Sequence, residues 1–296
     1  MNPVGRSRCD PEPPLNITKD MITTLEIPPA VSRKQIVAGK RSAEKLLAPF
    51  DELAAASPNV VAKPVVEIDS RGQKYTLPRY LFLGPKGGGD IIRIGIFATI
   101  HGDEPEGALG LVRFVTALEK NPELAKGYAL FIYPICNPTG FEDNTRHSHS
   151  GKDLNREFWV ESPEPEVRAL ETEIWTHAFH GIITLHSDDT SGGLYGFVNG
   201  AVLSEHLLEP ALQSAENFLP RNKRRTIDGF PARRGVLYSC YDGVLKSPAG
   251  LKQPPFEVTL ETPQDAPLHL QVEALNAALQ TILTEYRYLM AVAQNI

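Results

Sequence analysis

Four mainly apolar runs, five to nine residues long, recur along the chain and predict its central strands. Three are almost continuously apolar, as expected of strands buried on both faces, and the fourth alternates between apolar and polar residues. Segments with helical spacing of apolar residues separate or follow these runs. The predicted strands span residues 92–100, 128–136, 181–185 and 256–260, and the predicted helices span residues 106–118, 163–179, 203–218 and 268–292. The alternation predicts an α/β fold with a mixed, mostly parallel sheet and helices on both faces.

The region before the first of these strands divides into three parts. Residues 1–30 are rich in proline and polar residues and lack sustained periodicity, which predicts a poorly ordered arm. Helical spacing over residues 31–56 predicts a helix. Residues 65–84 are typical of two strands joined by a turn at Arg71 and Gly72. No linker or internal repeat interrupts the remainder, so we expect residues 31–296 to form one domain.

The composition is that of an ordinary globular protein. Of 296 residues, 42% are hydrophobic and 22% are charged, and 30 basic against 36 acidic residues give a net charge of −6. The basic residues cluster only at 221–225, which we interpret as a solvated loop, so the sequence gives no sign of a nucleic-acid partner. The oligomeric state is not predicted.

Cysteine usage and hydropathy bear on the cellular compartment. Cys9, Cys136 and Cys240 are too few and too widely spaced for a disulfide framework or a cysteine zinc site, which favours a reducing compartment. The N-terminus has no apolar leader, and no run of 18 apolar residues occurs, so neither export nor a membrane span is indicated. We therefore expect a cytoplasmic protein with no membrane partner.

A polar residue capable of chemistry follows each of the four predicted strands. These residues are His101, Asn137, His186 and Glu261. In open α/β sheets the binding crevice lies at the carboxyl ends of the strands, so these four positions can meet although they are spread over 160 residues.

The spacing of His101 and Glu104 suggests a metal site. Imidazole nitrogen and carboxylate oxygen are both good ligands for zinc, and a separation of three residues in a tight turn brings the two side chains together. His186 is suited to be the third ligand. Two histidines and one carboxylate would hold one zinc ion and leave a fourth position for water, which is typical of a catalytic site. The alternative is a loop histidine bonded to the backbone beside a solvated glutamate.

Four segments resemble motifs of the zinc carboxypeptidase superfamily, which includes the succinylglutamate desuccinylase and aspartoacylase type of deacylase. They are NPTGFEDNTRHSHSGKDLNREF at 137–158, ATIHGDE before it, LHS after it and FEVTLETP near the end, and they occur in the family's order. The resemblance runs from about residue 92 to residue 263. It implies that His101, Glu104 and His186 are the zinc ligands.

The same resemblance implies the roles of four further residues. Glu261 matches the general base, with Glu257 on the same strand as the competing carboxylate. Arg146 matches the arginine that stabilises the oxyanion, and Asn155 and Arg156 match the pair that binds the substrate carboxylate. Such roles are chemically reasonable for these side chains, and the alternative for each is an ordinary surface or turn residue.

The resemblance also implies a tyrosine on a mobile loop before the catalytic glutamate. Tyr238 and Tyr241 both fall in the right region, and the sequence does not choose between them or exclude a core role.

Other polar residues near the motifs are less strongly indicated as site residues. Asp103 and Asp188 are candidates for orienting a metal-binding histidine. His147 and His149 are interpreted as loop residues, and Lys246, Arg233 and Arg234 as solvent-exposed rather than as readers of an acidic substrate.

The motifs indicate amide hydrolysis, but different motifs favour different classes of substrate. The 35 residues after Glu261 resemble the ending of carboxypeptidases, whereas HGDE and DLNREF look closer to deacylases and to amidases of bacterial cell-wall peptides. We therefore expect a metallocarboxypeptidase or peptide amidase acting on a small peptide with a free carboxylate. A deacylase of N-acyl amino acids is the second possibility. A non-catalytic protein that keeps the zinc pocket as a binding site is a third, from another class.

Overall fold

The structure is a computed structural model that describes residues 41–70, 72–239 and 241–293. Its strands are β1 (Val60–Ala62), β2 (Val66–Ser70), β3 (Gln73–Leu77), β4 (Tyr80–Leu83), β5 (Ile92–Ala98), β6 (Tyr128–Tyr133), β7 (Gly181–Asp188), β8 (Tyr195–Val198), β9 (Thr226–Ile227), β10 (Phe230–Arg233), β11 (Val236–Leu237) and β12 (Phe256–Pro263). Its helical segments are α2 (Ala43–Ala56), α3 (Glu106–Lys120), η2 (Pro122–Ala125), α4 (Pro138–Asp143), η3 (Leu154–Arg156), α5 (Pro165–His177), α6 (Ala201–Leu203), η4 (Ser204–Leu208), α7 (Glu209–Ala215) and α8 (Leu268–Ala293). The arm expected at residues 1–30 lies outside the described residues, as do residues 31–40 of the helix expected over 31–56. Among the described residues, that helix begins at Ala43 after its N-cap Ser42.

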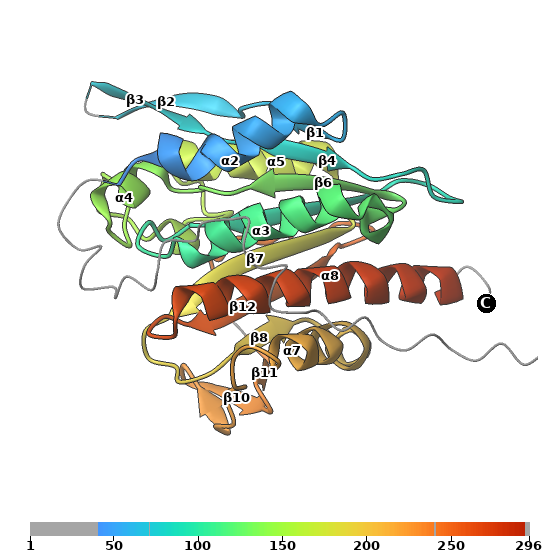
Figure 1. Ribbon diagram of the computed structural model, residues 1–296. Helices are drawn as coiled ribbons and strands as arrows, with labels where there is room; N and C mark the ends of the chain where they lie inside the picture. The colour runs from blue at the N-terminus through green and yellow to red at the C-terminus, as the bar shows by residue number, and fades with distance from the viewer. Residues whose placement is uncertain (1–40, 71, 240, 294–296) are drawn as a thin grey trace, which may run out of the picture.

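Ten of the strands form one mixed sheet in the order β1-β4-β6-β5-β7-β12-β8-β11-β10-β9 (Figure 1). The four central strands β6, β5, β7 and β12 are parallel to one another. On either side of them, β4 pairs antiparallel with β6, and β8 pairs antiparallel with β12. The central strands are the four apolar runs of the sequence, so the predicted fold class is confirmed. Since parallel strands end at the same edge, the polar residues at their carboxyl ends gather on one side of the molecule.

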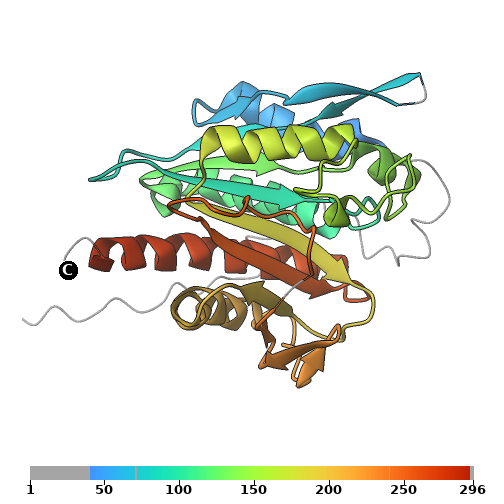
Figure 2. The same cartoon turned by 180° about the vertical axis from the view of Figure 1, so that it is seen from behind.

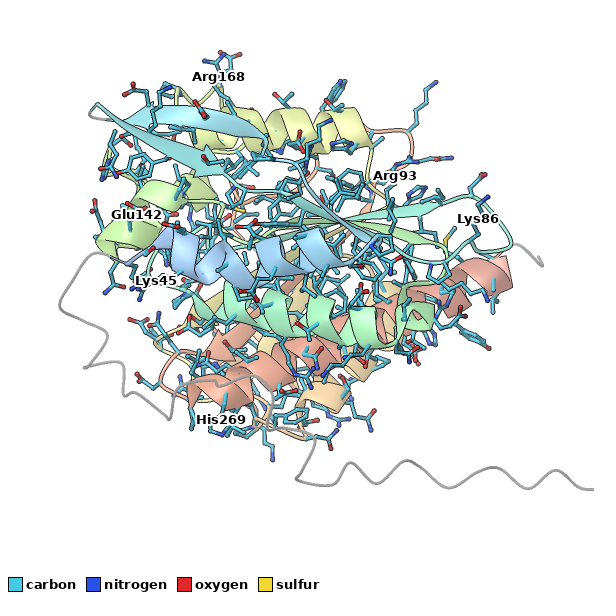
Figure 3. The ribbon with its side chains drawn as sticks, turned by 45° about the horizontal axis from the view of Figure 1, so that its top comes forward. Lys45, Lys86, Arg93, Glu142, Arg168 and His269 are labelled. Carbon is cyan, nitrogen blue, oxygen red and sulfur yellow. The ribbon has the colours of Figure 1, made fainter. Side chains whose placement is uncertain are left out.

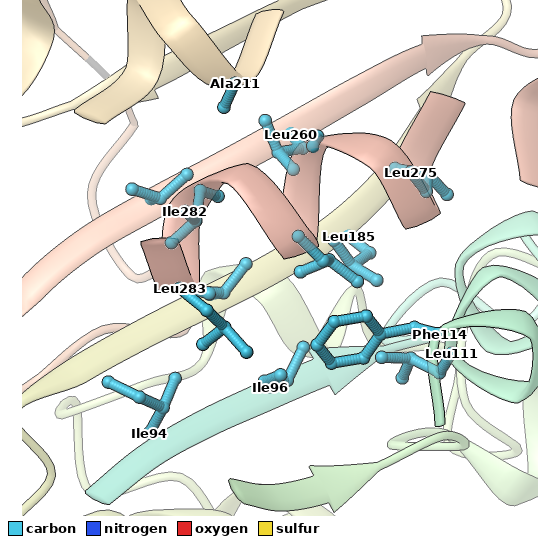
Figure 4. Packing of buried hydrophobic residues seen from close by; sticks show 14 of the residues in the cluster. Ile94, Ile96, Leu111, Phe114, Leu185, Ala211, Leu260, Leu275, Ile282 and Leu283 are labelled. Atoms are coloured by element: carbon cyan, nitrogen blue, oxygen red, sulfur yellow. The ribbon is translucent and has the colours of Figure 1, made fainter. Parts of the chain in front are cut away.

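The central strands are buried on both faces because their side chains alternate between two hydrophobic cores. Ile94 and Ile96 of β5 pack with residues of α3 and α8 in the larger core (Figure 4), whereas Phe97 of the same strand packs in the second core beside α5. Helices α2, α3, α7 and α8 lie over one face, and α5 lies over the other (Figures 1 and 2). Helices on both faces are therefore confirmed.

The outer faces of the helices carry polar side chains. Val167 and Leu170 of α5 are buried, and Arg168 between them is exposed. Arg168 of α5 and Lys45 of α2 are both exposed on the surface of the molecule (Figure 3). No helix within the described ranges is both long and apolar enough to cross a membrane.

Two predicted elements differ from the structure. Residues 65–84 form three strands rather than two: β2 and β3 make the expected hairpin, and β4 follows as a strand of the large sheet. Pro78 has no N–H to donate, which accounts for the end of β3 at Leu77. The helix predicted over 203–218 is the composite α6-η4-α7 over residues 201–215, with η4 in π-helical geometry. Pro210 cannot donate to the carbonyl four residues before it, which accounts for the irregular turn.

Candidate metal centre and active site

The three residues predicted as metal ligands lie together at the carboxyl edge of the sheet. His101 and Glu104 belong to the loop that follows β5, and His186 lies near the end of the neighbouring strand β7. The Glu104 carboxylate sits between the two imidazoles, with Oε1 2.6 Å from Nδ1 of His101 and Oε2 3.1 Å from Nδ1 of His186. All three side chains are buried, and one ligand atom from each lies within 4.8 Å of the others.

The loop that carries His101 and Glu104 turns sharply after β5. Thr99 has a φ of 53°, which is rare for a β-branched residue, and its hydroxyl donates to the Glu104 carbonyl at 3.1 Å. Gly102 approaches α4 so closely that a Cβ there would lie 2.0 Å from the carbonyl carbon of Gly140. The glycine of the HGDE motif is therefore required by contact between two backbones.

Asn137 ties this loop to the next one rather than lining the site. Its side chain is fully buried, and Nδ2 donates to the carbonyls of Ile100 and Arg146 at 3.3 Å each. Its Oδ1 accepts from the backbone N–H of Gly140 at 2.8 Å and so caps α4. The polar residue after β6 thus holds the backbones of the two loops in register.

The charges of the three side chains depend on one another. Burial alone would raise the pKa of Glu104, but the charge and hydrogen bond of His101, together with His186, hold it well below its usual value. Burial lowers the pKa of His101, but the charge of Glu104 and the hydrogen bonds with Asp153 and Glu104 raise it to about 9. Burial lowers the pKa of His186. Without metal, a proton on His101 compensates the buried carboxylate.

The donor set fits a divalent metal ion. A buried ionised carboxylate between two imidazole nitrogens needs a positive charge, and a cation could replace the proton held by His101. Two nitrogens and one oxygen at these separations are the ligands that borderline divalent ions prefer.

Glu261 enters the same cavity from the adjacent strand β12. Its Cα pairs with that of His186 on β7 and with that of Tyr195 on β8, so the three side chains lie on one face of the sheet. Burial and the nearby charges of Glu104 and Asp188 raise the pKa of Glu261 well above its usual value. The competing residue Glu257 does not line the cavity, and its carboxylate accepts hydrogen bonds from the N–H and hydroxyl of Ser247.

Arg146 lies beside the metal ligands and is held there by Asp153. Its Nε and Nη2 are 3.1 and 3.0 Å from Oδ2 of Asp153, and its Nη1 is 3.7 Å from Oε1 of Glu104. The other oxygen of Asp153, Oδ1, lies 3.2 Å from Nε2 of His101. One carboxylate therefore contacts both a predicted metal ligand and the neighbouring arginine.

Asn155, Arg156 and Tyr241 form another wall of the cavity. Oδ1 of Asn155 accepts from the backbone N–H of Leu245 at 2.8 Å, which fixes the loop between β11 and β12. The guanidinium carbon of Arg156 lies 4.4 Å from the centre of the Tyr241 ring, a cation–π contact. Tyr241 thus faces the cavity, whereas Tyr238 is 59% exposed and does not line it.

The remaining candidates lie outside the cavity or make other contacts. Asp103 and Asp188, the candidates for orienting a metal-binding histidine, both line the cavity, and Asp188 accepts from the Tyr195 hydroxyl at 2.9 Å. The carboxylate that lies beside the second ring nitrogen of a predicted metal ligand, His101, is instead that of Asp153. Nε2 of His149 lies 2.6 Å from Asp143 Oδ2. The residues that do not line the cavity are His147, His149, Arg233, Arg234 and Lys246.

Three residues of this cavity region were not predicted from the sequence: Asp153, Tyr195 and Asp228. Asp153 belongs to the DLNR segment that was identified, but its contact with His101 depends on the fold. Asp228 precedes Gly229, and both have positive φ, 50° and 81°, as in a two-residue hairpin turn. The Asp-Gly pair is a turn signal that would have revealed the β9-β10 hairpin. The complete cavity has a volume of about 400 Å³.

Part of the chain matches a known protein family. Residues 90–222 match the family described as the succinylglutamate desuccinylase/aspartoacylase catalytic domain, a stretch that holds the His-Glu-His cluster but ends before Glu261. No curated protein matches the sequence.

Solved structures share the fold. A candidate metallopeptidase from Shewanella denitrificans has a TM-score of 0.67 and 21% identity over 81% of this chain and 89% of its own. Another, from Shewanella amazonensis, has a TM-score of 0.66 and 25% identity over 81% and 90%. A metallo-carboxypeptidase from Pseudomonas aeruginosa, in complex with (2-guanidinoethylmercapto)succinic acid, has a TM-score of 0.60 and 18% identity over 83% and 69%. The match of residues 90–222 and the shared fold make the chain similar to succinylglutamate desuccinylase/aspartoacylase-like deacylases and to metallo-carboxypeptidases.

Proposed function

We propose that the chain is a zinc-dependent hydrolase that cleaves an amide bond next to a free carboxylate in a small peptide, as a metallocarboxypeptidase or peptide amidase. The observation that carries the proposal is the position of the Glu104 carboxylate between Nδ1 of His101 and Nδ1 of His186, with Glu261 paired beside His186. The three proposed metal ligands and the proposed proton acceptor, Glu261, therefore line one cavity.

Zinc suits this set of one carboxylate and two imidazoles, which leaves a coordination position open. A zinc ion held by these residues would polarise the amide carbonyl and lower the pKa of a coordinated water to about 7. Asp153 supports the site because its carboxylate faces the second ring nitrogen of His101 and fixes the orientation of that ring.

Glu261 is the proposed general base and acid. Its raised pKa means that it accepts a proton readily, which suits a group that takes a proton from the attacking water and passes it to the leaving amine. Such proton transfer by a positioned carboxylate typically contributes about 10²- to 10⁴-fold in rate.

Two arginines have distinct proposed roles. Arg146, beside Glu104, would stabilise the negative charge that develops on the carbonyl oxygen. Arg156, with Asn155, would bind the substrate carboxylate through paired hydrogen bonds and so position the scissile amide. The succinic acid derivative bound to the Pseudomonas aeruginosa relative supports a small substrate that bears carboxylates.

A deacylase of N-acyl amino acids is the second candidate. The match of residues 90–222 to the succinylglutamate desuccinylase/aspartoacylase catalytic domain favours it. The two activities share the metal, base and carboxylate-binding residues, and they differ in whether a peptide or an acyl group occupies the other side of the amide.

Hydrolysis assays on the purified, zinc-loaded chain test the proposal. Blocked dipeptides with a free carboxylate are compared with N-acetylaspartate and N-succinylglutamate, and Glu261→Gln is compared with Glu52→Gln on the exposed side of α2. We expect turnover of the dipeptides that Glu261→Gln abolishes and Glu52→Gln leaves intact.

Each other outcome has a distinct meaning. Turnover of the N-acyl amino acids alone would favour the deacylase. Tight zinc binding without turnover of any substrate would favour a non-catalytic binding protein. Full turnover by Glu261→Gln would contradict the proposed mechanism.

A further inference from the structure

A second cavity lies at the amino ends of the central strands, at the opposite edge of the sheet from the proposed metal ligands. Arg93 and Ile182 line it near the starts of β5 and β7, and several residues of the loop 247–255 line it just before β12. This loop passes near the C-terminal ends of α5 and α8, which supply further walls (Figure 2). The cavity has a volume of about 530 Å³, and none of the described residues lines both it and the active-site cavity. The proposed reaction therefore leaves it without a role.

Most of the wall of this second cavity is apolar. Ile174, Phe179 and Ile182 contribute buried side chains, and Tyr286 adds an aromatic ring from α8. Trp175 also lines the cavity although it is 66% exposed, so its indole lies at the opening. A cavity of this size with apolar and aromatic walls suits the apolar body of a small organic ligand.

The charged side chains that line the second cavity are basic. Arg93 and Lys252 carry positive charges, and His180 is the third basic residue of the lining. No aspartate or glutamate from the described part of the chain lines this cavity. Two acidic side chains are close to it, because the charge of Asp90 acts on His180 and Glu257 belongs to β12, but both lie outside the lining. The lining itself therefore carries a positive charge.

The charge of Arg93 is fixed in place by neutral groups. Its Nε donates to the carbonyl of His177 at 2.8 Å, and its Nη2 donates to the carbonyl of Ala178 at 3.2 Å. These acceptors hold the guanidinium at the end of α5 without compensating its charge. Within the described ranges, neither Arg93 nor Lys252 forms an ion pair with a carboxylate. Both cations can therefore pair with an anionic ligand.

His180 adds a hydrogen-bond donor to this lining. Its Nδ1 accepts from the backbone N–H of Arg93 at 3.0 Å, so the proton of the neutral ring is on Nε2. Burial and the charge of Arg93 lower the pKa of His180, which favours this neutral form. Two cations and one ring N–H thus accompany the apolar walls, a combination that suits an anionic group attached to an apolar body.

We propose that the second cavity binds a small organic acid that consists of one carboxylate on an apolar chain or ring. The carboxylate pairs with Arg93 and Lys252, and the apolar body lies against the walls beneath Trp175. A purely apolar ligand would take the two cations out of water without an anion, and an inorganic anion would leave the apolar walls uncovered. This inference does not depend on the proposed function, because the two cavities share no described residue.

Calorimetric titration of the full chain with octanoate and 2-naphthoate, and with the uncharged octanamide and 2-naphthamide, tests this inference. We expect at least one acid to bind, and its amide to bind about tenfold or more weakly, as expected for the loss of one charge-assisted hydrogen bond. Whether octanoate or 2-naphthoate binds more tightly distinguishes a chain from a ring. Lys252→Gln should weaken binding of the acid by a similar factor, whereas Lys86→Gln, which removes an exposed charge outside the lining, should not (Figure 3). Trp175→Ala should weaken the acid and its amide alike, because it removes only apolar contact.

Arg156→Gln shows whether the acids enter the active-site cavity instead. Binding that is lost in Arg156→Gln but kept in Lys252→Gln would place the acid in the active site and overturn the inference. Equal binding of acid and amide would overturn it as well, as would failure of both acids to bind at about 1 mM. A dimer in sedimentation experiments that Trp175→Glu dissociates would show that a second copy of the chain covers this cavity, which also overturns the inference.

Discussion

Oδ1 of Asp153 lies 3.2 Å from Nε2 of His101, while Glu104 contacts Nδ1 on the other side of the same ring. The imidazole is thus held at both nitrogens, with Nδ1 directed toward the metal ligands. Asp153→Asn should weaken zinc binding by about 10- to 100-fold, because it removes the charge that orients and polarises the ring. Competition with a chelating dye measures this affinity. Asp69→Asn, in the exposed part of β2, is the matched control, and unchanged zinc affinity in Asp153→Asn would count against the orienting role.

Glu261→Gln should lower kcat by about 10²- to 10⁴-fold and leave zinc binding intact, because the substitution removes the proton acceptor but no ligand. Steady-state kinetics and metal analysis on the same preparation check both parts. Loss of zinc together with activity would instead assign Glu261 a structural role at the metal centre.

The same substitution should stabilise the metal-free protein, by an amount that grows with pH. The folded-state pKa of Glu261 is raised above its ordinary value of 4.5, so the stability linked to its protonation is fully present below pH 4.5 and lost as the pH rises through the raised pKa. Glutamine does not titrate and avoids that loss. Thermal unfolding of the chelator-treated proteins should therefore show a Tm difference in favour of Glu261→Gln that is small at pH 4.5 and larger at pH 8. A Tm difference that becomes smaller as the pH rises would contradict this prediction.

Gly102→Ala should disturb the loop that carries His101 and Glu104, because the added Cβ would lie 2.0 Å from the carbonyl carbon of Gly140. We expect a loss of about 1–3 kcal/mol in the free energy of unfolding, as for other overpacked sites, together with weaker zinc binding. Gly88→Ala is the control, since a Cβ there meets no atom within 4 Å. Chemical denaturation compares the variants, and equal stability of Gly102→Ala and Gly88→Ala would disprove the close approach.

Tyr241 and Tyr238 should differ in their effect on the substrate. Tyr241→Ala removes the ring that packs on Arg156, and we expect it to raise KM for a carboxylate-bearing substrate. Tyr238→Ala should leave KM unchanged, because this side chain lies outside the cavity lining. Kinetic assays of both variants decide between the tyrosines, and the reverse result would mean that the loop rearranges when substrate binds.

The sequence was sufficient to predict the centre of the sheet because Ile94, Ile96 and Phe97 belong to a long run that is apolar on both faces. It was insufficient for strands β8 to β11, which are only two to four residues long. Strands this short carry too little periodicity to be recognised, and their pairing depends on the tertiary surroundings. The Asp228-Gly229 turn was the local signal available.

The clustering of the three proposed metal ligands could be predicted because each lies near the end of a recognisable strand. The contact of Asp153 with His101 and the choice between Tyr238 and Tyr241 depend on how two loops lie against each other. Asn155 fixes one of these loops through the backbone of Leu245, a contact that residue spacing does not reveal.

The central claim is that His101, Glu104 and His186 bind one zinc ion. A crystal structure of the zinc-loaded protein, with anomalous diffraction data at the zinc edge, tests it most directly. We predict a single anomalous peak about 2.0–2.2 Å from Nδ1 of His101, Nδ1 of His186 and a carboxylate oxygen of Glu104. A zinc peak bound elsewhere, or no peak among these three side chains in protein that has been saturated with zinc, would contradict the account.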